Sequence, residues 1–141
     1  MRILLIHNRY QKRGGEDFVF ETERGLLERA GHEVVVYERH NDEINAYPIW
    51  RRADLLRRTT WATDSASAIR KIVVRNRPQV AHFYNTFPLI SPAAYYACAA
   101  EGVPVVQTLS NYRLICPGAD LLRDGRPCEL CIGKTVAWNG I

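Results

Sequence analysis

The sequence predicts an α/β fold in which helices cover both faces of a doubly wound parallel sheet, and two observations support this prediction. Four short runs rich in Val, Ile and Leu show little alternation with polar residues, as expected of strands that are covered on both faces. Segments with helical patterns separate these runs, and such alternation indicates right-handed βαβ crossovers. The predicted strands are residues 2–7, 33–38, 80–84 and 104–109.

The segments between the strands have helical periodicity. The predicted helices are residues 15–30, 64–76 and 91–102, so that one or two helices separate the second and third strands. The apolar stripe of the first helix comprises Val19, Leu26, Leu27 and Ala30. In the second, Ile69, Ile72 and Val73 share one face. Both helices therefore have an apolar side with which to cover a sheet.

The chain has 141 residues, of which 47% are apolar and 24% charged, a composition typical of one soluble globular domain. Residues 1–109 are expected to form the sheet domain. Residues 110–141 are expected to be a cysteine-containing loop region of the same domain, within which the chain looks truncated. The apolar runs are too short for a membrane span or a secretion signal, so the expected location is the cytoplasm.

The net charge of +4 is unevenly distributed along the chain. Residues 16–43 hold nine acidic residues, whereas residues 51–77 hold eight Arg or Lys and two Asp, which predicts one face that attracts anions. Within the basic part, the stretch from Trp50 to Arg58 sets paired arginines beside Trp and Leu. This pattern indicates peripheral contact with the anionic inner face of a membrane. A solvated helix that packs by its apolar side is the other interpretation, and the sequence favours it.

Gly14-Gly15 lies between the first predicted strand and the helix that follows it. In an open α/β sheet, ligands bind outside the carboxyl ends of the strands. Glycine lets a bulky anion approach the backbone there, and the free N–H groups of a helix N-terminus bind phosphate. A tight turn without a ligand is the alternative, because the spacing matches neither the dinucleotide-binding nor the Walker motif.

Clusters of polar side chains follow the third and fourth predicted strands. The two clusters are Asn85-Thr86 and Ser110-Asn111-Tyr112-Arg113. Short hydrogen-bonding side chains at strand ends suit a hydroxyl-rich ligand, although the same side chains also cap loops. Since both clusters are expected at the same edge of the sheet, they favour a binding site.

Three of the four cysteines, Cys116, Cys128 and Cys131, lie in the last part of the chain. The spacing of Cys128 and Cys131 is typical of half of a structural zinc site, which needs four ligands. The fourth ligand would lie beyond Ile141. Cys98 falls within a predicted helix and is expected in the core. Three reduced cysteines that fill small gaps are the alternative.

Nearly the whole chain resembles the N-terminal half of family 4 (group 1) retaining glycosyltransferases, which have the GT-B architecture. The resemblance rests on ordered motifs, among them Gly14-Gly15-Glu16-Asp17, Asn85-Thr86-Phe87-Pro88 and Asn111-Tyr112-Arg113-Leu114. The matching segments are residues 3–8, 14–17, 31–34, 37–42, 85–92, 102–109, 111–118 and 124–131.

The resemblance implies a Rossmann-like half that binds the acceptor and faces a C-terminal half that binds a nucleotide-sugar. It implies that Gly14 and Gly15 approach the donor diphosphate. The residues that it implies on the acceptor side are Asn85, Thr86, Asn111 and Tyr112. No divalent cation is expected in catalysis, and structural zinc is the only metal that the sequence suggests. The fragment is expected to be inactive without its donor half.

The chain departs from the family at two positions, where the family usually has His immediately before the Asn-Thr-Phe-Pro and Asn-Tyr-Arg-Leu motifs. These positions hold Tyr84 and Ser110 here. In the family, the His at the second position helps to organise the transferring sugar. Ser110 is the candidate catalytic residue by its position, and it has a hydroxyl but lacks the imidazole.

Two other classes of function stay open at this point. A non-catalytic module that binds a nucleotide or another anion would explain Tyr84 and Ser110. A zinc-dependent nucleic-acid binder is more distant, because only Trp50 and Trp61 lie near the basic run as stacking aromatics. No nucleic-acid partner is therefore expected.

Overall fold

Four parallel strands pair in the order β2-β1-β3-β4 in the computed structural model of the chain, which describes residues 1–134. The strands are β1 (Arg2–Arg9), β2 (Glu33–His40), β3 (Val80–Phe83) and β4 (Val105–Gln107). The chain divides into two units, Met1–Thr108 and Leu109–Ile141, and the sheet belongs to the first. Because β1 pairs with both β2 and β3, the chain starts in the middle of the sheet and winds outward in both directions.

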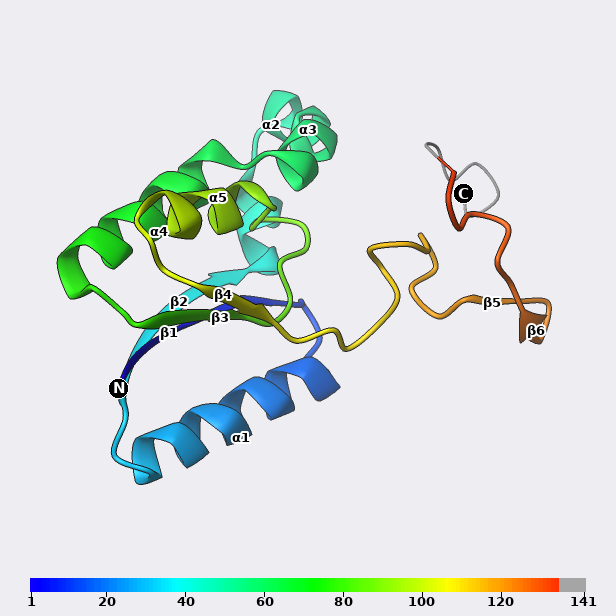
Figure 1. Ribbon diagram of the computed structural model, residues 1–141. Coiled ribbons are helices and arrows are strands. Elements are labelled where there is room, and N and C mark those ends of the chain that lie inside the picture. Colours follow the sequence, from blue (N-terminus) through cyan, green and yellow to red (C-terminus); the bar gives the residue numbers. More distant parts are fainter. Residues whose placement is uncertain (135–141) are drawn as a thin grey trace. The chain divides into compact units, whose positions relative to one another are not determined.

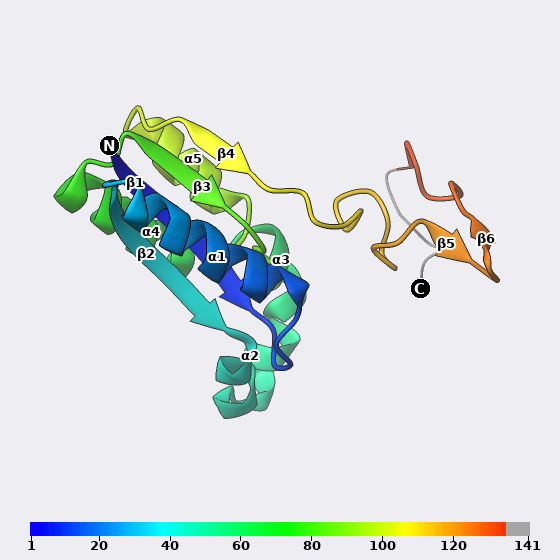
Figure 2. The same cartoon turned by 90° about the horizontal axis from the view of Figure 1, so that it is seen from below.

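Helices lie on both faces of the sheet, α1 on one and α4 and α5 on the other (Figures 1 and 2). Their bounds are α1 (Gly15–Arg29), α4 (Thr63–Asn76) and α5 (Ala93–Ala100). Three short elements precede α4, namely the 3-10 helix η1 (Asn41–Ala46), α2 (Ile49–Ala53) and α3 (Leu55–Thr60). The predicted α/β class, a parallel sheet flanked by helices, is confirmed.

The core has two layers, because side chains alternate along β1. Leu4 and Ile6 contribute to the larger layer under α4 and α5, where Cys98 is fully buried as predicted. Ile3 and Leu5 contribute to the layer that includes Phe20 of α1. Both faces of the strand are therefore covered, which explains its unbroken apolar run.

The stripe predicted for the first helix is wrong in most of its members. The side chains of α1 that are fully buried are Asp17 and Phe20, whereas Val19 and Leu26 are exposed. Leu27 alone of the predicted stripe packs on the core. Several sets of residues have helical spacing, and the position of the sheet decides which set is buried. On α4, Ile69 and Val73 are buried as predicted.

The second unit contains one antiparallel hairpin, β5 (Leu122–Arg123) with β6 (Arg126–Pro127). Asp124 and Gly125 join the strands with φ of 52° and 72°, a left-handed pair typical of tight hairpin turns. The remaining part of the unit that the structure describes consists of turns and bends. Among the helices of residues 1–134, none combines the length and the apolar character that crossing a membrane requires.

Candidate functional site

Asp17 connects the end of β1 with the turn that opens α1. One carboxylate oxygen, Oδ1, accepts a hydrogen bond from His7 Nε2 at 2.9 Å, and the other, Oδ2, accepts from the backbone N–H of Gly14 at 2.8 Å. Both side chains are buried. Burial opposes ionisation of Asp17, but the Gly14 N–H and His7 outweigh it and hold the pKa of the carboxyl below its usual range.

The turn that Asp17 holds is open to solvent. Gly14 is the N-cap of α1, and Gly14 and Gly15 are both exposed. Apart from neighbouring residues, no heavy atom lies within 4 Å of the place that a Cβ would occupy on either glycine. The first turn of a helix has N–H groups without intrahelical partners and a partial positive charge. A ligand can therefore reach these N–H groups.

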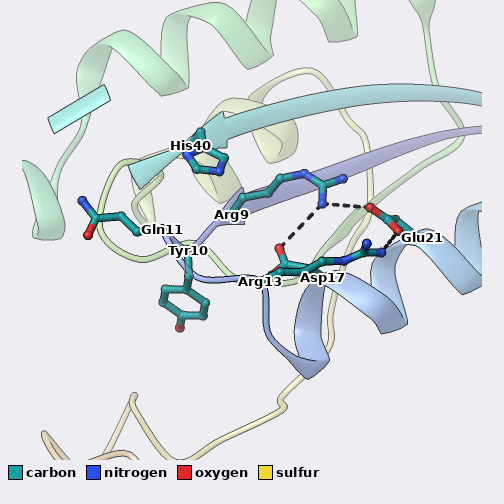
Figure 3. Close-up of a pocket in the computed structure, with 7 residues that line it drawn as sticks. All are labelled: Arg9, Tyr10, Gln11, Arg13, Asp17, Glu21 and His40. Atoms are coloured by element: carbon teal, nitrogen blue, oxygen red, sulfur yellow. Dashed lines mark hydrogen bonds and ion pairs between the residues drawn. The ribbon is translucent and has the colours of Figure 1, made fainter. Parts of the chain in front are cut away.

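A cavity of about 240 Å³ lies beside this turn, at the carboxyl edge of β1 and β2 (Figure 3). It is lined by Arg9, Tyr10, Gln11, Arg13, Asp17, Glu21 and His40. These residues come from the end of β1, the loop after it, the first two turns of α1 and the end of β2. Two arginines, a histidine and two carboxylates thus line a cavity next to the turn at which the sequence analysis placed an anion.

Arg9 is held firmly among three carboxylates. Its guanidinium donates to Glu38 at 2.6 Å and to Glu21 at 3.0 Å, and it lies 3.8 Å from Asp17. Although burial acts in the opposite direction, Glu38 and Glu21 raise the pKa of Arg9. The guanidinium is one-quarter exposed and faces the cavity as a fixed positive charge.

Arg13 is held more loosely than Arg9. It also pairs with Glu21, as Figure 3 shows, but its side chain is 65% exposed and that of Glu21 is 42% exposed. An exposed ion pair contributes little net free energy, typically about 0 to 1 kcal/mol. An incoming anion can therefore take the place of Glu21 on Arg13 at low cost.

The predicted acceptor residue Asn85 is occupied by contacts within the chain. Its side-chain amide donates to the Asn8 carbonyl at 2.6 Å, and its side-chain oxygen accepts from the Phe87 N–H at 3.1 Å. The backbone N–H of Asn8 donates to the Asn85 carbonyl at 2.8 Å. Asn85 thereby ties the end of β3 to the end of β1. Thr86, which is half-buried, has a side-chain hydrogen bond with Tyr95.

The other predicted polar cluster lies in the second unit. Ser110 and Tyr112 are exposed, and Asn111 is half-buried. The Asn111 side-chain oxygen accepts a hydrogen bond from the Arg113 N–H at 3.0 Å, a turn within the motif itself. Gly14, Gly15, Asn85 and Thr86 belong to the first unit.

The side chain of Tyr84 packs within the core and links two elements of the fold. Its ring is buried against Phe20 and stacks on His82, with centroids 4.4 Å apart in the second case. Its hydroxyl donates to Glu23 on α1. Burial and this hydrogen bond raise the pKa of Tyr84. The phenol is therefore a neutral donor that links β3 to α1.

Cys116 and Cys131 line one cavity of about 290 Å³ in the second unit, and Cys128 lines a different one. The backbone N–H groups of Leu121, Gly118 and their neighbours lower the pKa of the Cys116 thiol. Within residues 1–134, no three or more His, Cys, Asp or Glu side chains form a group that could hold a metal ion. Structural zinc at these cysteines stays a prediction.

The sequence analysis assigned no site role to Arg9, Arg13, Asp17, Glu21 or His40, although Asp17 and His40 lie in segments that carry the resemblance. A usable signal was present for Asp17, because an acidic side chain three positions after the N-cap can accept a hydrogen bond from the backbone N–H of the N-cap residue. His40 lies at the end of β2, and its place beside Arg9 depends on the pairing of β2 with β1, which the sequence pattern does not reveal.

We compared the chain with known protein families, curated proteins and solved structures, and none of them matches it.

Proposed function

We propose that this chain is the acceptor-side, Rossmann-like half of a retaining GT-B glycosyltransferase, which works with a C-terminal half that binds a nucleotide-sugar. The sugar passes to a glycan or to a lipid-linked acceptor. The observation that best supports the proposal is the open Gly14-Gly15 turn, which is flanked by Arg13 and Arg9 at the carboxyl edge of a parallel sheet.

In this proposal the turn receives the diphosphate of the donor. The N–H groups at the start of α1 donate to phosphate oxygens, and the helix dipole favours the negative charge. Arg13 moves from Glu21 to the phosphate, while Arg9 stays fixed behind it. These groups stabilise the departing diphosphate without a divalent cation.

The alternative is an α/β module that binds a nucleotide or another anion and transfers no sugar. Tyr84 favours this alternative, because its hydroxyl is bound to Glu23 and its ring is buried. Both functions use the same anion site. They differ in whether a chain that includes the donor half turns over a nucleotide-sugar.

Titration of the chain with uridine, guanosine and adenosine diphosphates, followed by backbone amide NMR, tests the anion site. We expect the largest shifts at Gly14, Gly15 and Glu16, and none with uridine alone, because the nucleoside lacks phosphate. Arg13→Ala should weaken binding by about tenfold, the loss of one charge-assisted hydrogen bond. Arg24→Ala is the matched control, since Arg24 is also exposed on α1 and paired with a glutamate. Shifts that avoid residues 9–17 would contradict the proposal.

A further inference from the structure

Two consecutive short helices, α2 and α3, expose the large apolar side chains of Ile49, Trp50 and Leu56. The exposed fractions are 86%, 71% and 85%, and Ile49 and Leu56 are the two most exposed large apolar side chains within residues 1–134. A core-forming helix buries such residues. Here the chain holds three of them in solvent within eight positions.

The segment that carries them, residues 49–58, is anchored at both ends. Tyr47 just before it is buried, and its hydroxyl accepts from Arg39 at 3.2 Å. Beyond α3, Ala62 is buried and its N–H donates to Ser91 Oγ at 2.7 Å. The exposure of the three apolar side chains therefore belongs to a segment that is fixed to the sheet domain on either side.

The segment carries an excess of positive charge, although Arg51 and Arg58 both lie within ion-pair distance of Asp64. Residues 49–58 contain four arginines and one aspartate. Arg52 donates to the backbone carbonyls of Tyr47 and Asn45, which carry no net charge, so the full charge of its guanidinium remains. Arg57, 68% exposed, is the partner of Asp54 at 2.6 Å.

We infer that segment 49–58 docks the domain on an anionic lipid bilayer. Trp and aliphatic side chains enter the boundary between headgroups and acyl chains, and arginines beside them bind lipid phosphates. Charge complementarity selects this occupant, because a lipid surface offers apolar depth and negative charge at the same place. The inference does not depend on sugar transfer, and it would stand if the domain only bound anions.

Sedimentation with vesicles tests the inference. One set contains phosphatidylcholine alone, and the other contains phosphatidylcholine mixed with phosphatidylglycerol. We expect the 141-residue chain to bind the mixed vesicles and to be released as salt is raised. Leu56→Gln should weaken binding by about tenfold, because the leucine loses its apolar burial. Arg57→Glu should weaken it further, since each basic residue near the surface contributes roughly a fivefold factor.

Two controls on α1 match these variants. Leu26→Gln makes the same change at a leucine that is 53% exposed, and Arg24→Glu makes the same charge reversal at an exposed paired arginine. Both should bind mixed vesicles as the parent chain does. All four residues are at the surface, and circular dichroism checks that each variant is folded.

Three results would overturn the inference: no binding to mixed vesicles, equal binding to both vesicle types, or equal losses in the variants and their controls. Concentration-dependent self-association that Leu56→Gln abolishes, without vesicle binding, would assign the segment to a second copy of the chain instead.

Discussion

His7 Nε2 and Asp17 Oδ1 lie 2.9 Å apart inside the first unit, with both side chains out of contact with solvent. The His7 ring also stacks on Phe20, with centroids 4.8 Å apart. Because the same carboxylate binds the Gly14 N–H, this pair connects the core of the sheet to the glycine turn. The position of the proposed anion site therefore depends on the buried hydrogen bond between His7 and Asp17, as well as on the arginines that line the cavity.

The first prediction concerns this pair. Asp17→Ala should lower the free energy of unfolding by about 2 to 4 kcal/mol, because it leaves a buried histidine and a backbone N–H without their acceptor. Urea unfolding followed by circular dichroism measures the change. Glu28→Ala, which breaks an exposed pair with Arg24 on the same helix, should cost less than about 0.5 kcal/mol. Equal losses in the two variants would contradict the structural role of Asp17.

The second prediction concerns acid. The pKa of Asp17 is lowered from its ordinary 3.8, so the unfolded chain takes up this proton more readily than the folded one. The stabilisation by Asp17 is therefore complete above about pH 5 and is lost as the pH falls through the folded-state pKa. Asp17→Asn should show a smaller loss of stability between about pH 5 and pH 3 than the parent chain. Parallel curves in that range would show that other carboxyls carry the acid dependence.

The third prediction concerns Glu21, which occupies both arginines of the cavity. Glu21→Gln should strengthen the binding of pyrophosphate by about threefold to tenfold, since it removes a competing carboxylate and a repulsive charge. Calorimetric titration at constant ionic strength measures the affinity. The matched control is Glu28→Gln, which removes the same charge from α1 and should leave affinity unchanged. Weaker binding after Glu21→Gln would show that Glu21 orients the arginines for the anion.

The fourth prediction is that residues 1–141 alone transfer no sugar. In the proposed enzyme the reacting groups meet between two halves, and one half cannot hold them in attack geometry. Incubation of the purified chain with uridine, guanosine and adenosine diphosphate sugars, followed by detection of released nucleoside diphosphate, measures turnover. Release above that of an Arg13→Ala control would contradict the two-half arrangement.

The fifth prediction concerns the cysteines of the second unit. Backbone N–H groups favour the thiolate of Cys116, which is the form that binds zinc. We expect cobalt titration to give thiolate-to-metal absorption that is lost in Cys116→Ser and retained in Cys98→Ala. The second variant is the control, because Cys98 is buried in the core of the first unit and burial raises its pKa to about 11. Absence of a cobalt signal in the parent chain would contradict the metal site and would favour three reduced cysteines that fill small gaps.

Local signals determined which segments form helices and strands. Val80–Phe83 is apolar except for His82, and Pro78 ends the preceding helix close to where the sequence predicts. The Gly14-Gly15 turn could also be found from the sequence, because its glycines stand at a strand-to-helix junction. The Asp124-Gly125 turn was present as a dipeptide signal for the hairpin of the second unit, but the two-residue strands beside it have no periodicity to detect.

Periodicity, caps and turn residues act over a few neighbouring positions, so the sequence by itself determined the α/β class, the helices that cover the sheet and the glycine turn. Only the tertiary structure decided that His40 and Arg9 border one cavity, since this depends on the pairing of β1 with β2. It also decided that Asp17 and Phe20 are buried in place of Val19 and Leu26. The rotation of a helix about its axis is set by the surface on which it packs, and that surface is built from residues far away in the chain.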